Sequence, residues 1–169
     1  ALRFGENVEL TRQVVEIARE YGAFVEAELG AIVGAEDRAE VGATSAAMTD
    51  PAQADEFVRA TGVGALAIAI GNVHGFYRGE PRLDMTRLRE IRARVQVPLV
   101  LHGASGLAAE TIKQAIALGV CKFNVNTEIR VAFFNALRAQ LTDEPTDYDI
   151  TRLYAPAIAA MQRFAERVS

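Results

Sequence analysis

The sequence predicts an α/β fold built on a parallel sheet. Short apolar runs alternate four times with longer amphipathic stretches along the 169 residues. The runs at 65–70 (ALAIAI) and 99–101 (LVL) are uninterrupted, which is typical of strands that are covered on both faces. Strands and helices that alternate in this way form parallel sheets with right-handed crossovers. We therefore expect strands at 24–29, 65–70, 99–101 and 122–125.

The predicted helices have recognisable start signals. Asp50 and Pro51 form an N-cap and first-turn pair that opens a helix ending before Gly62. Asp84 is expected to cap a further helix that runs to about residue 95. The other helices are expected at 7–21, 108–118, 128–141 and 152–168. In the first of these, the face expected to be buried carries Val8, Leu10, Val14, Val15, Ile17 and Ala18.

Composition narrows the class of protein. Half of the residues are apolar, which suffices for the core of one domain over 1–169. The net charge is −4 and no basic block occurs, so neither nucleic acid nor a membrane surface is expected as a partner. We expect a cytoplasmic location, because no membrane span or secretory signal is recognisable. The lone Cys121 cannot form an internal disulfide and is interpreted as a small core residue.

The two histidines of the chain occupy matching positions. His74 and His102 each follow an apolar run and precede a glycine. Because the carboxyl ends of parallel strands meet at one edge, both imidazoles are expected to share a site. Glu26 and Glu28 alternate on one side of the first strand, which is either its wet side or a functional one. Two imidazoles and a carboxylate make a three-ligand zinc site with an open position.

A second site is suggested by residues 103–106 (GASG), which lead from a strand toward a helix. Backbone N–H groups and a helix N-terminus favour an anion such as phosphate at this place. Side chains that end the next strand, Asn124, Asn126 and Thr127, would offer donors to the same anion. The alternative is that the loop uses these residues only for its geometry. The long loop at 30–49 is also a candidate functional segment.

Four motifs together carry a family resemblance: VEAELG (25–30), AIGNVHGFY (69–77), PLVLHGASG (98–106) and KFNVNTE (122–128). In this order they resemble the class II, zinc-dependent ketose-bisphosphate aldolases, and most closely the fructose-/tagatose-bisphosphate branch. The resemblance runs from about residue 4 to residue 168. It implies a TIM (β/α)8 barrel, of which this chain would hold the last four β/α units with flanking helices, the C-terminal half.

The resemblance also implies roles for individual residues. His74, His102 and Glu28 match the metal ligands, and Glu36 matches a catalytic acid on the loop that follows the first strand. Arg130 matches a position that reaches the substrate of a neighbouring subunit, which implies a homo-oligomer. The positions implied to bind substrate or its phosphate are Gly75, Gly103, Ser105, Asn124, Asn126, Thr127 and Arg130.

The implied activity is zinc-dependent aldol cleavage of a ketose 1,6-bisphosphate, of fructose or tagatose type, to dihydroxyacetone phosphate and an aldehyde. This is a lyase reaction of carbohydrate metabolism such as glycolysis, and a second divalent or monovalent cation is compatible with it. The family's catalytic aspartate and first zinc histidine are adjacent, and the sequence contains no Asp-His pair. We therefore expect an N-terminal half to complete the site. The alternatives are a non-catalytic aldolase-like subunit or fragment that binds a phosphosugar, and another metal-dependent lyase on the same scaffold.

Overall fold

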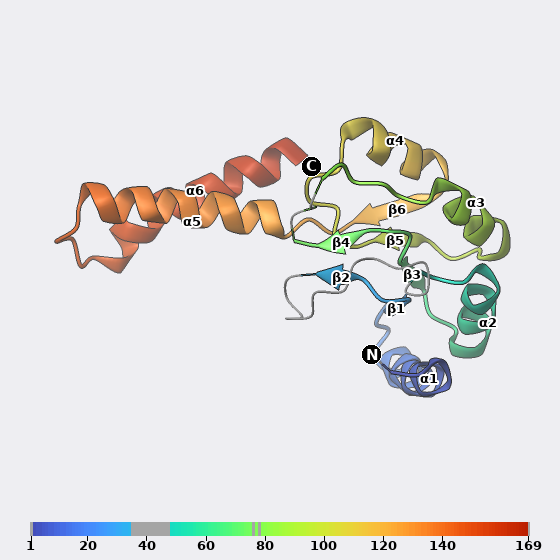
Figure 1. Cartoon of the computed structure of the whole chain (residues 1–169). Coiled ribbons are helices and arrows are strands. Elements are labelled where there is room, and N and C mark those ends of the chain that lie inside the picture. Colours follow the sequence, from blue (N-terminus) through green and yellow to red (C-terminus); the bar gives the residue numbers. More distant parts are fainter. Residues whose placement is uncertain (1, 35–47, 76, 78, 169) are drawn as a thin grey trace. The chain divides into compact units, whose positions relative to one another are not determined.

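A computed structural model describes residues 2–34, 48–75, 77 and 79–168 (Figure 1). The chain forms two compact units, residues 1–124 and 125–169, and each is described by itself. The expectation of a single domain over 1–169 stays a prediction.

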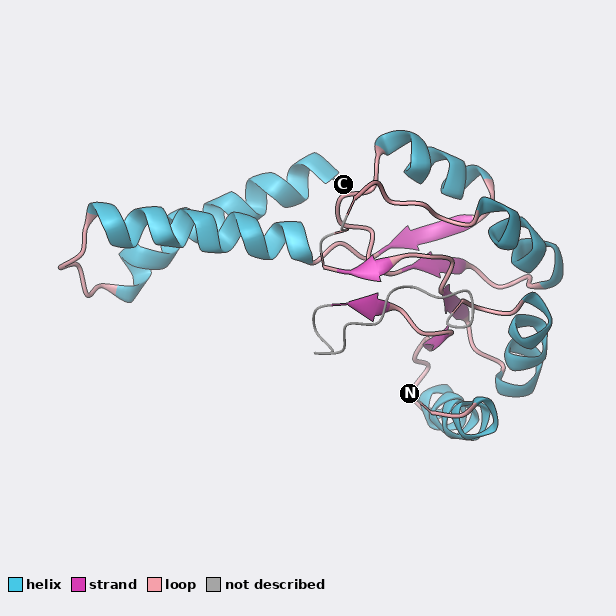
Figure 2. Ribbon diagram, in the orientation of Figure 1, coloured by secondary structure: helices cyan, strands magenta, loops and turns pink. Residues whose placement is uncertain are grey.

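The first unit contains the predicted parallel sheet. Its four strands lie in chain order, β1 (Glu26–Leu29), β3 (Ala65–Ile68), β5 (Leu99–Leu101) and β6 (Val120–Phe123). A helix separates each strand from the next, as Figure 2 shows. The α/β prediction is therefore confirmed. Two shorter strands that the sequence did not predict, β2 (Val33–Gly34) and β4 (Val73–His74), form a second parallel pair.

The helices of this unit are α1 (Phe4–Glu20), α2 (Pro51–Thr61), α3 (Met85–Arg94) and α4 (Ala109–Ala117). The predicted caps are confirmed. The Asp50 side chain accepts hydrogen bonds from the amides of Ala52 and Gln53, at 2.8 and 3.0 Å. The Asp84 side chain accepts from the amide of Arg87 at 2.9 Å.

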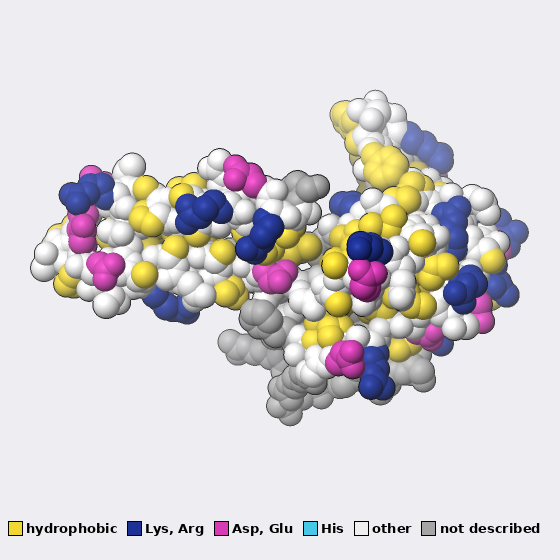
Figure 3. All heavy atoms as spheres, turned by 90° about the horizontal axis from the view of Figure 1, so that it is seen from above, with side chains coloured by type: hydrophobic (Ala, Val, Ile, Leu, Met, Phe, Trp, Pro, Cys, Tyr) yellow, Lys and Arg dark blue, Asp and Glu magenta, His cyan; other side chains and the backbone are white. Residues whose placement is uncertain are grey.

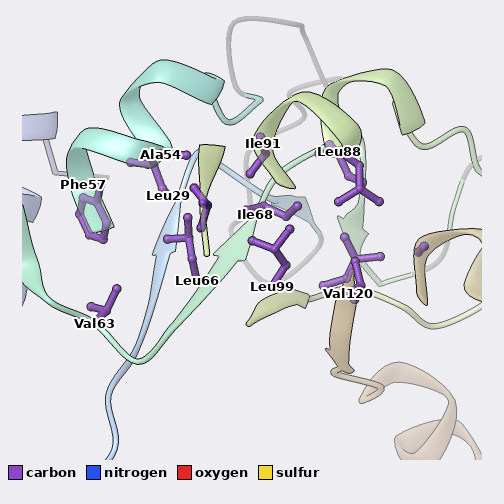
Figure 4. Packing of buried hydrophobic residues seen from close by; sticks show 14 of the residues in the cluster. Leu29, Ala54, Phe57, Val63, Leu66, Ile68, Leu88, Ile91, Leu99 and Val120 are labelled. Atoms are coloured by element: carbon purple, nitrogen blue, oxygen red, sulfur yellow. The ribbon is translucent and has the colours of Figure 1, made fainter. Parts of the chain in front are cut away.

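The hydrophobic core lies between the sheet and its helices (Figure 4). Leu66 and Ile68 of β3 and Leu99 of β5 are fully buried there, and Leu88 and Ile91 of α3 pack against them. Because side chains alternate along a strand, the intervening residues lie on the opposite face. Those residues, Ala65, Ala67 and Val100, form a second buried cluster of small side chains.

The predicted buried face of α1 is wrong in part. Leu10, Val14 and Ile17 are 52%, 45% and 59% exposed, whereas Thr11 and Val15 are 8% and 4% exposed. The helix carries two apolar stripes, and it packs on the core of the unit along the stripe that contains Val15 only. Periodicity could not distinguish them, because both stripes have helical spacing.

The last strand is shifted relative to its prediction, and Cys121 is exposed rather than buried in the core. The strand begins directly after Gly119, two residues earlier than expected, as the fourth and last strand of the sheet. Leu99 pairs with Val120 but Val100 pairs with Lys122, so Cys121 is the extra residue of a β-bulge. A bulge residue at the end of a sheet is left out of the core.

The second unit is a pair of helices, α5 (Thr127–Asp143) and α6 (Ile150–Val168), which pack along each other (Figure 1). The rings of Phe133 and Tyr154 lie 6.0 Å apart between centroids and join the two helices. Among the described residues, no helix combines the length and apolar character that crossing a bilayer requires. On the face shown in Figure 3, Lys and Arg side chains stand among acidic and apolar ones.

Candidate metal centre

Three side chains that could bind a metal converge in the first unit. Glu28 comes from β1, His74 from β4, and His102 directly follows β5. One ligand atom of each lies within 4.8 Å of the others, and all three residues are partly buried. Within the described residues, this is the one group of three His, Cys, Asp or Glu side chains with such an arrangement. The predicted pairing of the two histidines and Glu28 is thus present in the fold.

Asn72, which is 2% exposed, joins the ends of β3 and β5 through its side chain. Its amide nitrogen donates to the carbonyls of Ile68 and His102, at 3.2 and 3.0 Å. Its amide oxygen accepts from the backbone N–H of Ile70 at 2.8 Å. A buried side-chain amide with all these partners fixes the backbone that carries His102.

The two histidine loops also touch directly. Gly103 has φ +63°, and a Cβ placed on it would lie 2.1 Å from the carbonyl oxygen of Val73. Only glycine permits this approach, because it combines a left-handed backbone with the absence of a side chain. As a result, the imidazoles of His74 and His102 have their ring centroids 6.3 Å apart.

Tyr77 bridges the same two loops. Its hydroxyl donates to the carbonyl of Gly103 at 3.0 Å and accepts from the backbone N–H of Val73 at 3.4 Å. Burial raises the pKa of Tyr77, and the hydrogen bond from Val73 opposes this only in part. The hydroxyl therefore stays protonated and able to donate over the physiological pH range.

His102 lies between two carboxylates. Its Nδ1 is 2.7 Å from Oε2 of Glu28, and its Nε2 is 3.0 Å from Oε1 of Glu26. Oε2 of Glu26 accepts from Nζ of Lys122 at 2.8 Å. Burial opposes ionisation of Glu26, but the hydrogen bonds from Lys122 and His102 outweigh it and lower the pKa of this carboxyl. Glu26 is thus an anion with one partner on each oxygen.

The donor set fits a zinc ion. Imidazole nitrogen and carboxylate oxygen bind Zn²⁺ at about 2.1 Å, which places tetrahedral ligands roughly 3.4 Å from each other. Both ring nitrogens of His102 face carboxylates, so both contacts can be hydrogen bonds only when an extra proton is present. A cation between His102 and Glu28 removes that requirement. The three ligand atoms that lie within 4.8 Å of one another are those that would hold the ion.

Several of the residues predicted to bind phosphate lie beside this centre. Gly75 directly follows His74, and Ser105 is 2% exposed within the loop that follows β5. Asn124 is held next to that loop, because its backbone N–H donates to Leu101 and its carbonyl accepts from Ala104, at 3.0 and 3.2 Å. One amide of the predicted phosphate loop, that of Ala104, is therefore already engaged.

The remaining predicted residues are not placed at this centre. Asn126, Thr127 and Arg130 belong to the second unit, where Thr127 begins α5 and the backbone N–H of Arg130 donates to Asn126 at 3.1 Å. Glu36 lies outside the described residues. Their assignment to the site stays a prediction.

Sequence reasoning missed two contributors to the centre, Lys122 and Tyr77. For Glu26, the sequence showed only that it shares one side of its strand with Glu28. This alternation was the available signal that Glu26 belongs to the centre. Nothing in the sequence marks Lys122, because a bulge determines which face it occupies. Tyr77 lies close to His74 in sequence, yet its partner Gly103 is 26 residues away.

Comparisons with known proteins identify the family and the fold of the chain. The profile of the family described as fructose-bisphosphate aldolase class-II matches residues 1–169. The YdjI aldolase from Escherichia coli K12 is 38% identical with a TM-score of 0.75, and the match covers 99% of this chain and 56% of that one. For a Coccidioides immitis protein described as a fructose-1,6-biphosphate aldolase, the identity is 37%, the TM-score 0.81 and the coverage 99% and 58%.

A fructose-bisphosphate aldolase from Campylobacter jejuni, at 20% identity, shares the fold with a TM-score of 0.74, over 98% of this chain and 56% of that one. The chain therefore spans little more than half of the length of these structures. The predicted fold, half of an aldolase barrel, is confirmed.

Proposed function

Because the chain belongs to the class II fructose-bisphosphate aldolase family, we propose that it supplies the zinc-binding part of an aldolase active site. The reaction is cleavage of a ketose 1,6-bisphosphate, of fructose or tagatose type, to dihydroxyacetone phosphate and an aldehyde. The observation that carries this proposal is the convergence of Glu28, His74 and His102 from three separate elements.

His74, His102 and Glu28 would hold the metal. When bound, zinc supplies Lewis-acid polarisation of a ketone or hydroxyl oxygen of the substrate. The two histidine loops orient the ligands, since Gly103 and Tyr77 fix the distance between them. A second divalent or monovalent cation remains part of the proposal.

The phosphate of the three-carbon product would bind beside the metal. Gly75, Gly103 and Ser105 lie on the two histidine loops, and Asn124 is hydrogen-bonded to the second of them. Small residues let the backbone approach an anion closely, and a buried hydroxyl adds a donor. The proposal further assigns phosphate or substrate binding to Asn126, Thr127 and Arg130.

Proton transfer is assigned to Glu36, on the segment between β2 and α2. Its carboxyl group would act as general acid and base at the substrate. The proposal also includes a cytoplasmic location, and assembly either with an N-terminal half or as a homo-oligomer.

A second candidate is a non-catalytic aldolase-like subunit that binds a phosphosugar. This candidate is favoured because the chain matches only part of the length of its relatives, 56% of the YdjI aldolase and 58% of the Coccidioides protein. Such a subunit would bind zinc and phosphate without turnover.

The test combines metal analysis with a cleavage assay. We would measure zinc per chain, and then cleavage of fructose and tagatose 1,6-bisphosphates by the chain alone and mixed with an N-terminal half of a class II aldolase. One zinc per chain with cleavage in the mixture supports the proposal. A zinc-loaded complex of the two halves that cleaves neither sugar contradicts it, and phosphosugar binding by that complex would then identify the second candidate.

A further inference from the structure

Glu26, on the first strand of the sheet, connects the metal centre to the last strand. It lies on β1, yet its carboxylate contacts His102 beyond β5 and Lys122 on β6. Neighbouring strands are about 4.8 Å apart, so β1 and β6 are separated by roughly 14 Å along the sheet. The two long side chains nevertheless meet over that span.

The register of the sheet places these groups on one face. Glu26 pairs with Ala65 and Glu28 with Ala67. Ala67 in turn pairs with Val100, and Val100 with Lys122. Paired residues of parallel strands share a face, so both carboxylates and the ammonium group lie on the side opposite the helices. The small side chains of Ala65 and Ala67 leave room for the longer ones to cross over them.

Lys122 reaches this face only because of the bulge at Cys121. With an unbroken register, Val100 would pair with Cys121, and Lys122 would point toward the helix side. Bulges commonly re-aim a side chain next to an active site. The bulge therefore turns an exposed cysteine away from the ladder and brings a cation onto Glu26.

The partners of Glu26 define the orientation of the His102 ring. Oε2 is engaged by Lys122, which leaves Oε1 to accept from Nε2. A proton on Nε2 leaves the lone pair of the imidazole on Nδ1, and Nδ1 faces Glu28. Metal-bound histidines are commonly held in this way by a carboxylate on their other nitrogen.

We propose that Glu26, anchored by Lys122 across the sheet, is a positioning residue that holds His102 with Nε2–H on the carboxylate and Nδ1 toward the metal. This inference rests on the proposed metal site of Glu28, His74 and His102. It assigns to Lys122 a role that depends on Glu26, so removing both side chains should cost no more than removing Glu26 alone.

The primary measurement is zinc affinity, by competition with a chromophoric chelator, on the full 169-residue chain. Glu26→Gln should weaken binding about tenfold to a hundredfold, as loss of such outer partners typically does. Lys122→Met should weaken it by roughly threefold to tenfold, the net contribution of one typical hydrogen bond. Lys122→Arg should keep the zinc affinity within about twofold of the unaltered chain, because arginine retains a cationic donor.

The matched control is Lys113→Met. Lys113 makes an exposed ion pair with Glu110 at 2.8 Å on α4, so its loss removes the same charge without touching the centre. Its zinc affinity should stay within about twofold of the unaltered chain. A loss equal to that of Lys122→Met would show a general charge effect and would overturn the proposal.

A second readout reports the imidazole directly. The chain has two histidines, so ¹⁵N side-chain spectra can be assigned with one substitution at each. The zinc-loaded chain should show the proton of His102 on Nε2, and Glu26→Gln should broaden or shift that signal while His74 changes little. The proposal is overturned if the signal of His102 is unaffected by Glu26→Gln.

The failures of the two proposals are distinguishable. If His102→Ala abolishes zinc binding while Glu26→Gln leaves affinity within twofold, the positioning role is wrong and the metal site stands. If the unaltered chain binds no zinc, both are overturned.

Discussion

Gly103→Ala tests how closely the two histidine loops depend on each other. The new Cβ would lie 2.1 and 2.7 Å from the carbonyl oxygen and carbon of Val73, and 3.3 Å from the amide nitrogen of His74. A left-handed backbone costs a residue with a Cβ roughly 1–2 kcal/mol. Overpacking against backbone adds about 1–3 kcal/mol. The expected loss in the free energy of unfolding is therefore about 2–5 kcal/mol.

The control for this substitution is Gly22→Ala. Gly22 has the same φ of +63°, but no heavy atom lies within 4 Å of its added Cβ. It should lose only the backbone contribution of roughly 1–2 kcal/mol. Urea unfolding of both variants gives the difference that belongs to the clash with Val73.

Zinc affinity should separate the two variants further. Moving the loop of His102 away from that of His74 lengthens the distance between two ligands, so Gly103→Ala should weaken zinc binding by at least about tenfold. Gly22→Ala should leave it unchanged. If Gly103→Ala is no more harmful than Gly22→Ala in either measurement, the close approach of the loops is not what holds the centre.

Three further predictions follow from single contacts. Tyr77→Phe removes the hydroxyl that joins Val73 to Gly103 and should cost about 1 kcal/mol of stability in urea unfolding. Because burial raises the pKa of Tyr77, its contribution is complete below the ordinary tyrosine value of about 10 and should fade as the pH rises above it, a dependence that Tyr77→Phe should lack. Asp50→Ala removes the cap of α2 and should cost about 1 kcal/mol, whereas Asp50→Asn should cost less. The hydrogen bond from the amide of Gln53 lowers the pKa of Asp50; burial opposes this shift, and the hydrogen bond from Ala52 adds to it. The contribution of Asp50 is therefore present above about pH 4 and lost as the pH falls below that. Equal acid midpoints for Asp50→Ala and the unaltered chain would contradict this. His102→Ala should abolish tight zinc binding in the chelator assay, and an unchanged zinc content would refute its role as a ligand.

Local signals were sufficient to predict most of the fold. Asp50 and Asp84 are at their predicted capping positions, and the sheet consists of the four predicted strands. These features depend on neighbours within a few residues and on alternation, which a single sequence contains. The buried face of α1 could not be predicted in this way, because Leu10 and Val15 lie on apolar stripes of equal periodicity and only tertiary packing chooses between them.

The candidate site could likewise be predicted from the sequence only in part. The convergence of His74 and His102 followed from the rule that parallel strands end at one edge. The bridges that hold them, from Tyr77 to Gly103 and from Lys122 to Glu26, join residues 26 and 96 positions apart. Such contacts depend on register, and the bulge that turns Lys122 inward has no signature in the sequence.

The most direct test of the proposed metal site is a crystal structure of the zinc-loaded chain with anomalous scattering measured at the zinc edge. We expect one strong peak within about 2.0–2.3 Å of ligand atoms of Glu28, His74 and His102. The Nδ1 atom of His102 should be the ring nitrogen nearer to the zinc, with Nε2 still hydrogen-bonded to Glu26. A peak elsewhere in the molecule, or no peak in crystals grown with zinc, would contradict the proposed metal site.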